Sequence, residues 1–453
     1  MTSAVADPEA PTRDVGRAHQ FAWILGAIVL GAFILRVVYI LTARQDFIDA
    51  FPRGNLYELG DAYLYQKGAV LLVEGKGFIS PYLYDKGISQ QDASHPPLFM
   101  LWLAIPSLFG LKTALAHALW SAVLGAGTIA VVGLAGREMF SARAGLIAAA
   151  LAAIYPNVFS HDGFLQSETM AIFTVTLTVW MAYRFWHRPS IWNAVWVAVG
   201  CGLAALSRSE LALLVVFLFL PLVLVTKPAD ARTRWRRLGA GAAALAIVVG
   251  PWVIFNLTRF DRPEFLSDNF GYTLLTATCD NTYYGPSTGY WDFGCAFDYY
   301  NEIDAANNDR SRNDALFRDK ALDYIKDHKK RVPVVALARV ARFTGVWDLT
   351  HDFDQVHKDE IVEGREGFVA WGGAIGWFVM VPFAMYGLVA MRRRRITLIP
   401  VLAPFATALT AAVLLFYMNR YRASTEAVLC LVAAVGVDAL LSRRRRSHVV
   451  DAN

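Results

Sequence analysis

Ten blocks of apolar residues, each about 17 to 24 residues long, follow one another along this chain. A helix needs about 20 such residues to cross the ~30 Å hydrocarbon core of a bilayer. Hydrophobic residues make up 56% of the sequence and charged residues only 18%, against about half and about a quarter in soluble domains. The sequence therefore predicts an all-α integral membrane protein with about ten transmembrane helices. The predicted spans are 21–43, 113–135, 143–159, 167–184, 190–207, 211–226, 239–258, 369–390, 396–417 and 423–441.

The basic residues predict the orientation of these spans, because Lys and Arg concentrate in short cytoplasmic loops. If the ten spans alternate, all of the basic clusters fall on one side. These clusters are Arg13/Arg17, Arg137/Arg143, Arg184/Arg188, 231–237, 392–395 and 443–446. We therefore predict a cytoplasmic tail over 1–20, a polytopic membrane domain over 21–441 and a basic cytoplasmic tail over 442–453. The net charge of +5 then reflects topology and anionic lipid headgroups and not nucleic acid.

Two long segments, about 44–112 and 259–368, fall outside the cell in this topology. Both are rich in aromatic residues, and three surface helices are predicted in them. An apolar helical stripe predicts the first over 61–74. Pro96 and Pro97, which suit a first turn, and an apolar run too short for a span predict the second over 95–110, and an amphipathic segment within 313–347 is the third. Cys279 and Cys295 lie close together in the second segment. Because an outside compartment permits disulfides, we predict a bridge between them, with two free thiols as the alternative.

Ionisable groups at membrane depth are costly and usually have a partner or a function. Four clusters of them fall on the outer side of the predicted topology, whereas the cytoplasmic loops carry no comparable acidic set. This asymmetry predicts a polar cavity at the outer leaflet. The clusters are Glu58/Asp61, Asp162/Glu168, Arg208/Glu210 and Arg420/Arg422.

Each cluster also has a structural interpretation. Asp61 can cap the helix that follows it, and Asp162-Gly163 can form a turn. Arg208 and Glu210 can pair within a hairpin, and arginines near span ends can extend to lipid headgroups. The headgroup interpretation applies to Arg420 and Arg422 and, more strongly, to Arg36 in the first span. Tyr63 and Tyr65 are interpreted as anchors at the membrane interface.

Metal and nucleotide chemistry have little support in the sequence. His95 and His161 have acids nearby but no H-x-x-H or HExxH spacing, so a divalent metal ion is kept only as an alternative. The chain also has no phosphate-binding glycine loop and no nucleophile elbow, which argues against nucleotide-dependent or serine-hydrolase chemistry.

Several stretches resemble the C-type membrane glycosyltransferases, and in particular glycosyltransferase family 39, which includes protein O-mannosyltransferases and lipid A aminoarabinose transferases. They are GDAYLYQKGAVLLVEGKGF, SHPPLFMLWLA, YPNVFSHDGFLQSETM, GLAALSRSELALL and NRYRASTEAVLCLVAAVG. Two further stretches, CDNTYYGPSTGYW and DHKKRVPVVALARVARFTGVW, are similar to an actinobacterial subgroup. The resemblance covers about 21–441.

The resemblance implies transfer of a sugar from a polyprenyl-phosphate donor to a hydroxyl acceptor on the outer face of the membrane, with inversion at the anomeric carbon. The family's acid at the head of the first outer surface helix matches Asp61, and a second acid matches Asp162, with Glu168 next along. Many relatives have an Asp-Glu pair where this sequence has Asp61-Ala62, so that part of the pattern is missing.

The residue types suit this chemistry. A carboxylate can accept the proton of an attacking hydroxyl, and arginines can stabilise a departing phosphate with paired hydrogen bonds. We therefore predict Asp61 and Asp162 as catalytic residues. The predicted substrate-binding residues are Glu168, Arg208, Glu210, Arg420, Arg422, Arg339, Arg342 and His95.

Two other interpretations remain open in the sequence. A transporter or flippase for a lipid-linked or polar substrate would share the spans and the cavity, although transporters usually contain repeats and interrupted helices at mid-membrane. The second interpretation is a family relative that binds a lipid-linked sugar without transferring it. It stays open because the second acid after Asp61 is missing.

Overall fold

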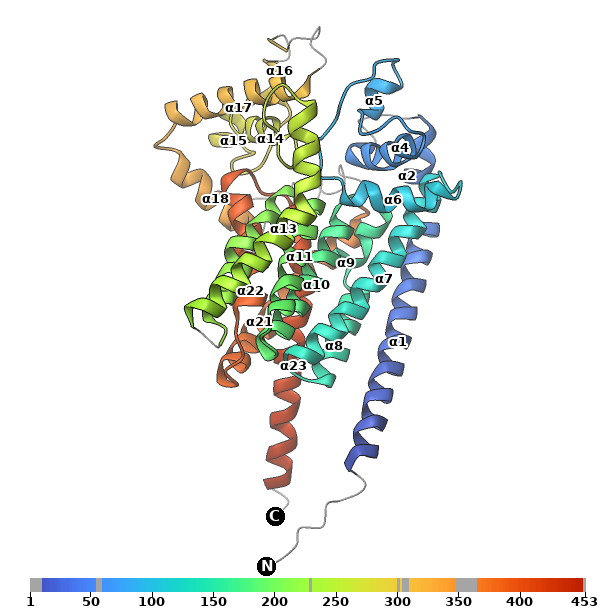
Figure 1. The fold of residues 1–453 in the computed structure, drawn as a ribbon, viewed down its shortest axis with the longest axis vertical. Coiled ribbons are helices and arrows are strands. Elements are labelled where there is room, and N and C mark those ends of the chain that lie inside the picture. The colour runs from blue at the N-terminus through green and yellow to red at the C-terminus, as the bar shows by residue number, and fades with distance from the viewer. Residues whose placement is uncertain are drawn as a thin grey trace, which may run out of the picture.

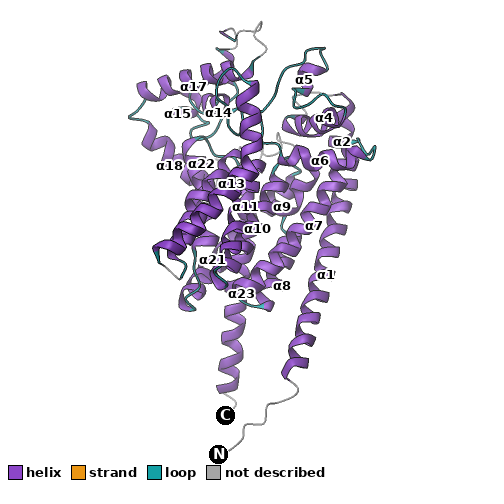
Figure 2. Ribbon diagram, in the orientation of Figure 1, coloured by secondary structure: helices purple, strands orange, loops and turns teal. Residues whose placement is uncertain are grey.

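A bundle of long helices and a set of shorter helices build the protein, as a computed structural model shows (Figures 1 and 2). The structure describes residues 10–53, 59–227, 230–299, 302–303, 309–347 and 365–450. Long, roughly parallel helices form a bundle, and shorter helices gather at the end of the bundle opposite the start of α1 and the end of α23 (Figure 1). The bundle helices are α1 (Ala10–Ala43), α7 (Ala114–Met139), α8 (Ala142–Ile154), α10 (Glu168–His187), α11 (Ile191–Ser207), α13 (Ala231–Arg259), α21 (Gly367–Arg393), α22 (Ile399–Leu414) and α23 (Asn419–Val450).

Each of the ten predicted spans is helical. Among the residues that the structure describes, five helices are long and apolar enough to cross a membrane by themselves, namely those in α1, α7, α13, α21 and α23. A sixth candidate is α8 with Pro156–Gly163, which is bent by 74°. The predicted fold class, an all-α multi-pass membrane protein, is confirmed.

The sixth predicted span differs from a regular helix. It consists of a 3-10 turn (η3, Ser209–Leu213), a π-helical turn (η4, Val215–Phe219) and the short helix α12 (Leu220–Val225). Pro221, near the start of α12, has no backbone N–H to donate, so the regular ladder is interrupted at this point.

Close packing inside the bundle depends on small residues. A Cβ atom on Gly387 of α21 would lie 2.1 Å from the carbonyl oxygen of Val432, and one on Gly436 of α23 would lie 2.1 Å from that of Phe383. The two backbones therefore touch, as is common where small residues face each other in membrane helices. Of these five candidate spans, α23 is the most buried, at 78% of its apolar window, and α13 is the least buried, at 17%.

The two outer segments form two helical groups above the bundle (Figure 1). The first contains α2 (Gln45–Ala50), η1 (Phe51–Arg53), α4 (Asp61–Val73), α5 (Pro81–Tyr84) and α6 (Leu98–Leu108). The second contains α14 (Phe270–Leu275), α15 (Asp280–Tyr283), α16 (Gly294–Phe297), α17 (Arg310–Asp327) and α18 (Val332–Thr344). Helices α4, α6 and α18 correspond to the three predicted surface helices. Between α8 and α10 lie α9 (Pro156–Phe159) and η2 (Ser160–Gly163).

A disulfide joins Cys279 to Cys295 in the second group, with their Cα atoms 5.5 Å apart. It closes a loop with a sequence separation of 16 residues, and in the chain-entropy account such a loop contributes about 3 kcal/mol to stability.

We expect the double variant Cys279→Ser/Cys295→Ser to lower the free energy of local opening by about this amount, measured by native-state proteolysis. A reductant should increase proteolysis of the wild type to the level of the double variant. It should not change proteolysis of the double variant, because the remaining cysteines, Cys201 and Cys430, are buried free thiols. Equal proteolysis of variant and wild type would contradict this expectation.

Candidate active site

A cavity of about 2810 Å³ lies between the two outer helical groups and the adjacent ends of the bundle helices. Pockets for single small molecules usually measure about 300–1,000 Å³, so this cavity has room for more than one ligand. Its lining includes six of the residues predicted from the sequence: Asp61, His95, Arg208, Glu210, Arg342 and Arg420.

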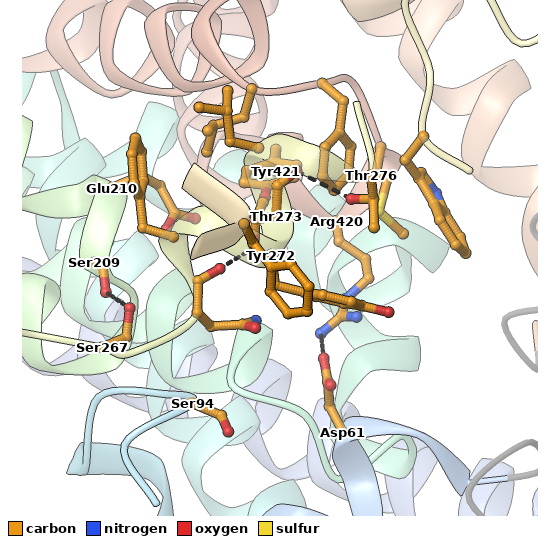
Figure 3. Close-up of a pocket in the computed structure, with 18 of the residues that line it drawn as sticks. Asp61, Ser94, Ser209, Glu210, Ser267, Tyr272, Thr273, Thr276, Arg420 and Tyr421 are labelled. Atoms are coloured by element: carbon orange, nitrogen blue, oxygen red, sulfur yellow. Dashed lines mark hydrogen bonds and ion pairs between the residues drawn. The ribbon is translucent and has the colours of Figure 1, made fainter. Parts of the chain in front are cut away.

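Asp61 is the first residue of α4 and lies in this cavity (Figure 3). The helix begins there because Gly60 adopts a φ of +48°, a backbone conformation that glycine accepts readily, and because Tyr82 donates a hydrogen bond of 2.8 Å to the Gly60 carbonyl oxygen. The Asp61 side chain caps no backbone N–H of α4. The capping interpretation of Asp61 is therefore wrong, and its carboxylate is available to other groups.

Both carboxylate oxygens of Asp61 face nitrogen atoms. Oδ2 accepts a hydrogen bond of 2.9 Å from Arg420 Nη2, and Oδ1 lies 3.3 Å from His95 Nε2. The His95 ring stacks on Tyr65, with centroids 4.9 Å apart. Tyr65 follows Asp61 by four residues and so shares its helix face. It is buried, not an interface anchor, and Tyr63 is also buried, donating to Asp85.

The electrostatic state of Asp61 follows from these neighbours. Burial by itself raises the pKa of Asp61, but His95 and the Arg420 guanidinium lower it by more, so the pKa lies well below its usual range. Asp61 is therefore an ionised carboxylate at neutral pH, with 31% of its side chain exposed to the cavity.

Arg420 also belongs to a chain of alternating charges. Its Nε donates to Glu168 Oε1 at 2.5 Å, and Arg208 Nη1 donates to the same oxygen at 2.6 Å. Arg208 Nε in turn donates to Glu210 at 2.5 Å, so these two residues form the ion pair that was one interpretation of the sequence. The Glu168 side chain is fully buried, behind the two arginines that line the cavity.

Arg422 is directed elsewhere. It follows Arg420 by two residues, and residues two apart do not share a helix face. It is buried, donates to Glu426 at 2.7 Å and lies over the Trp377 ring at 4.0 Å. Among the described residues, the lining of the cavity does not include Arg422.

Arg339 and Arg342 of α18 hold backbone carbonyl groups. Arg339 donates to Val413 and Ala277, and Arg342 donates to Thr288 at 2.9 Å. Arg342 lines the cavity, whereas Arg339 is not part of the described lining. The Arg339 bond to Val413 of α22 attaches the second outer group to the bundle, whereas Arg420 pairs directly with Asp61.

Asp162, a predicted catalytic residue, lies away from the cavity lining among the described residues. It is 1% exposed and accepts a hydrogen bond of 2.5 Å from Arg36 Nε, and Arg36 is fully buried. Arg36 therefore does not extend to lipid headgroups, which corrects the sequence interpretation. A Cβ atom on Gly125 would overlap the Asp162 carboxylate, so a glycine in α7 makes room for this pair.

The position of this pair predicts a structural role. Removing one partner of a buried ion pair typically costs about 3–5 kcal/mol, whereas replacing both by apolar residues is often neutral. We expect Asp162→Leu to lower the thermal unfolding temperature strongly and Arg36→Leu/Asp162→Leu to restore most of the loss. An additive double variant would contradict this coupling.

The two remaining predictions concern Glu58 and a divalent metal ion. Glu58 lies outside the described residues. Within the described chain, no three His, Cys, Asp or Glu side chains are grouped as ligands for a metal ion.

Comparison with known proteins agrees with this architecture. Residues 94–255 match the family model described as dolichyl-phosphate-mannose-protein mannosyltransferase. The archaeal oligosaccharyltransferase AglB from Archaeoglobus fulgidus, solved with an inhibitory peptide and a dolichol-phosphate, has a TM-score of 0.51 and 16% identity over 95% of this chain and 52% of its own. The same enzyme tethered to an acceptor peptide has a TM-score of 0.51 and 17% identity over 93% and 50%.

ArnT from Cupriavidus metallidurans, bound to undecaprenyl phosphate, is more distant, with a TM-score of 0.40 and 18% identity over 90% of this chain and 78% of its own. No curated protein sequence matches the chain. The chain thus has the fold of the C-type membrane glycosyltransferases, and the resemblance predicted from its sequence is confirmed. It spans about half the length of the archaeal enzyme.

Sequence reasoning missed several carboxyl groups of the cavity, among them Asp268, Asp314 and Glu264. Glu264 lies just after α13, between Pro263 and Phe265, and lines the cavity. An acid beside a proline at the outer end of a predicted span was the available signal, but the pattern matched no motif.

Proposed function

We propose that this protein is an inverting glycosyltransferase that moves a sugar from a polyprenyl-phosphate donor to a hydroxyl acceptor during synthesis of a cell-envelope glycan, glycolipid or glycoprotein. The observation that carries the proposal is the contact between Asp61 and Arg420 in a large cavity at one end of the membrane bundle. A carboxylate able to accept a proton and a guanidinium able to bind a phosphate thereby lie within a hydrogen bond of each other. The family match over 94–255 and the shared fold support the same class of reaction.

In this proposal the acceptor hydroxyl attacks the anomeric carbon while Asp61 accepts its proton. The new carbon–oxygen bond forms as the bond to the lipid phosphate breaks, and the phosphate leaves with the electron pair. Arg420, held by Glu168 through Nε, directs Nη2 toward the position of the phosphate and stabilises its charge. Attack from the face opposite the leaving group inverts the anomeric configuration.

The pairing of Arg420 with Asp61 couples donor binding to the strength of the base. Without donor, Arg420 and His95 keep the pKa of Asp61 well below its usual range, which makes Asp61 a weak proton acceptor. A donor phosphate that binds Arg420 competes with Asp61 for Nη2 and partly neutralises the guanidinium. The pKa of Asp61 then rises toward its ordinary value, so the base becomes stronger when a donor is present.

The test is transfer by the full chain in lipid nanodiscs from a panel of polyprenyl-phospho-sugars to hydroxyl acceptors. We expect consumption of at least one donor, and a product whose anomeric configuration, determined by NMR, is opposite to that of the donor. A retained configuration, or donor-independent passage of substrate in sealed vesicles without any transfer, would contradict the proposal. The second outcome would favour the transporter interpretation.

We further propose that the cavity faces outward and that both termini are cytoplasmic. Ile88 lies in the first outer group and is 47% exposed, whereas Arg394 follows α21 at the opposite end of the bundle. A membrane-impermeant thiol reagent applied to intact cells should label Ile88→Cys but not Arg394→Cys. The reverse labelling pattern would overturn the orientation.

A further inference from the structure

A second group of charges lies in the same cavity and takes no part in the proposed transfer step. Glu264, Asp268 and Asp314 contribute to the lining together with Arg310 and Arg318. Glu264 and Asp268 belong to the segment between α13 and α14, whereas the other three residues belong to α17. Carboxylates from two elements therefore face one part of the cavity.

Most of these groups already have partners. Asp314 Oδ1 accepts backbone N–H groups from Gly271 at 2.7 Å and from Tyr272 at 3.2 Å. Asp268 accepts the backbone N–H of Ala93 at 2.9 Å and Arg310 Nε at 3.3 Å. The positive charge of Arg310 is therefore compensated by Asp268 within the protein.

Glu264 differs from these neighbours. It is only 8% exposed, yet no residue in the described part of the chain donates a hydrogen bond to its carboxyl group or forms an ion pair with it. The backbone beside it is fixed, because Asn256 Nδ2 donates to the Phe265 carbonyl at 3.1 Å and Trp252 Nε1 to that of Leu266 at 2.9 Å. A carboxyl group with so little exposure usually has a partner, and because Glu264 lines the cavity, a partner can reach it from there.

We propose that Glu264 forms the subsite for a positively charged group, an ammonium or guanidinium, on the acceptor substrate. This proposal rests on the proposed glycosyl transfer and names a chemical feature of its acceptor. Glu264 supplies the hydrogen-bond acceptor for the cation. The negative charges of Asp268 and Asp314 attract the cation as well, and backbone hydrogen bonds already hold both side chains in place.

Charge separates the two substrates within the cavity. The donor carries a phosphate, which favours Arg420 beside Asp61 and is repelled by the carboxylates of Asp268 and Asp314 near Glu264. The ligand in the acidic part is therefore the substrate that lacks the phosphate, namely the acceptor. A metal ion fits poorly, because the described residues offer no grouping of three or more His, Cys, Asp or Glu ligands and the lone pairs of Asp268 and Asp314 are partly used.

The ionisation of Glu264 gives the subsite a characteristic pH dependence. Burial, followed by the charges of Asp314 and Asp268, raises the pKa of Glu264 to about 8; Arg318 lowers it and Asp309 raises it further. The empty site is therefore largely protonated at pH 7, and a bound cation stabilises the ionised form. Affinity for a cation should rise with pH between about 6 and 9, a range in which an alkylammonium group keeps its charge.

A matched pair of probes tests the subsite directly. The probes are 6-aminohexan-1-ol, which is cationic, and 6-acetamidohexan-1-ol, which is neutral, and binding to the full chain in nanodiscs is measured by calorimetry or ligand-observed NMR. We expect the wild type to bind the amine about tenfold or more tightly than the amide, since charge-assisted hydrogen bonds are the stronger ones. Glu264→Gln, which mimics the protonated carboxyl, should remove this preference.

The control variant is Glu302→Gln, which removes an exposed carboxylate of the same outer group that pairs with Lys320. It should keep the preference for the amine. Equal affinity of the wild type for both probes, a preference that persists in Glu264→Gln, or amine binding that does not change from pH 6 to 9 would overturn the proposal. The pH series needs only the wild type, so it decides the question even if a variant folds poorly.

Failure of this inference can be told apart from failure of the proposed function. Probe binding requires no donor and no transfer, so Glu264-dependent amine binding together with absent transfer would contradict only the glycosyltransferase proposal. Asp61-dependent transfer without any Glu264-dependent amine preference would contradict only the acceptor subsite.

Discussion

Asp61→Asn lowers kcat for sugar transfer by about 100- to 10,000-fold, the range expected when a general base is removed. Asparagine has the shape of aspartate but accepts no proton from the acceptor hydroxyl. Because the variant also frees Arg420 from its 2.9 Å ion pair, we expect KM for the donor to stay the same or to fall. Single-turnover transfer in nanodiscs measures the chemical step without product release.

The matched control is Asp46→Asn, which changes an exposed aspartate in the same outer group and should leave the rate unchanged. A full rate in Asp61→Asn would exclude Asp61 as the base. A raised donor KM with unchanged kcat would assign Asp61 to substrate holding, and donor binding with no turnover by the wild type would favour a protein that only binds the lipid-linked sugar.

Glu168→Gln is expected to have the second large effect, on both stability and donor binding. Glu168 is fully buried, and a single oxygen accepts from both Arg420 and Arg208. Loss of its charge leaves two guanidinium groups close together with less compensation. Breaking such a buried network costs about 3–5 kcal/mol, so the thermal unfolding temperature should fall markedly.

The effect on the reaction distinguishes a positioning role from general destabilisation. Below the unfolding temperature, Glu168→Gln should raise KM for the donor more than it lowers kcat, because Arg420 is no longer held at Nε. Glu210→Gln is the control, since Glu210 pairs with Arg208 and is 14% exposed, and its effect should be much smaller. A Glu168→Gln protein with wild-type stability and wild-type donor KM would contradict the positioning role.

The membrane fold could be predicted well from the sequence, because it depends on properties that individual segments carry. Apolar blocks of sufficient length must become helices in a bilayer, where no water satisfies the backbone. The helices at α4, α6 and α18 were also predictable from local signals, namely apolar periodicity and, for α6, the prolines at its start. The irregular span over Ser209–Val225 was not, because hydropathy does not distinguish α from 3-10 or π backbone.

The candidate site could be predicted only in part. The sequence placed eight acids and arginines at one side of the membrane, but it could not say which of them point into a common space. Arg420 and Arg422 are two residues apart and therefore lie on different faces of α23. Arg420 lines the cavity, whereas Arg422 pairs with Glu426. Asp162 and Asp61 are equally acidic in the sequence, yet one is neutralised by Arg36 inside the bundle and the other lies in the cavity.

By itself, the sequence determined that the chain is a multi-pass helical membrane protein with polar groups concentrated at one side, because hydropathy and charge act segment by segment. Only the tertiary structure decided which polar groups meet. Arg420, Glu168 and Asp61 come from three distant parts of the chain, and side chains as far apart as 359 residues form one ion pair. Burial then separates the polar groups into structural pairs and cavity-facing groups, and it leaves the little-exposed Glu264 carboxyl group without a partner among the described residues. Partner choice and solvent access arise only when the helices pack.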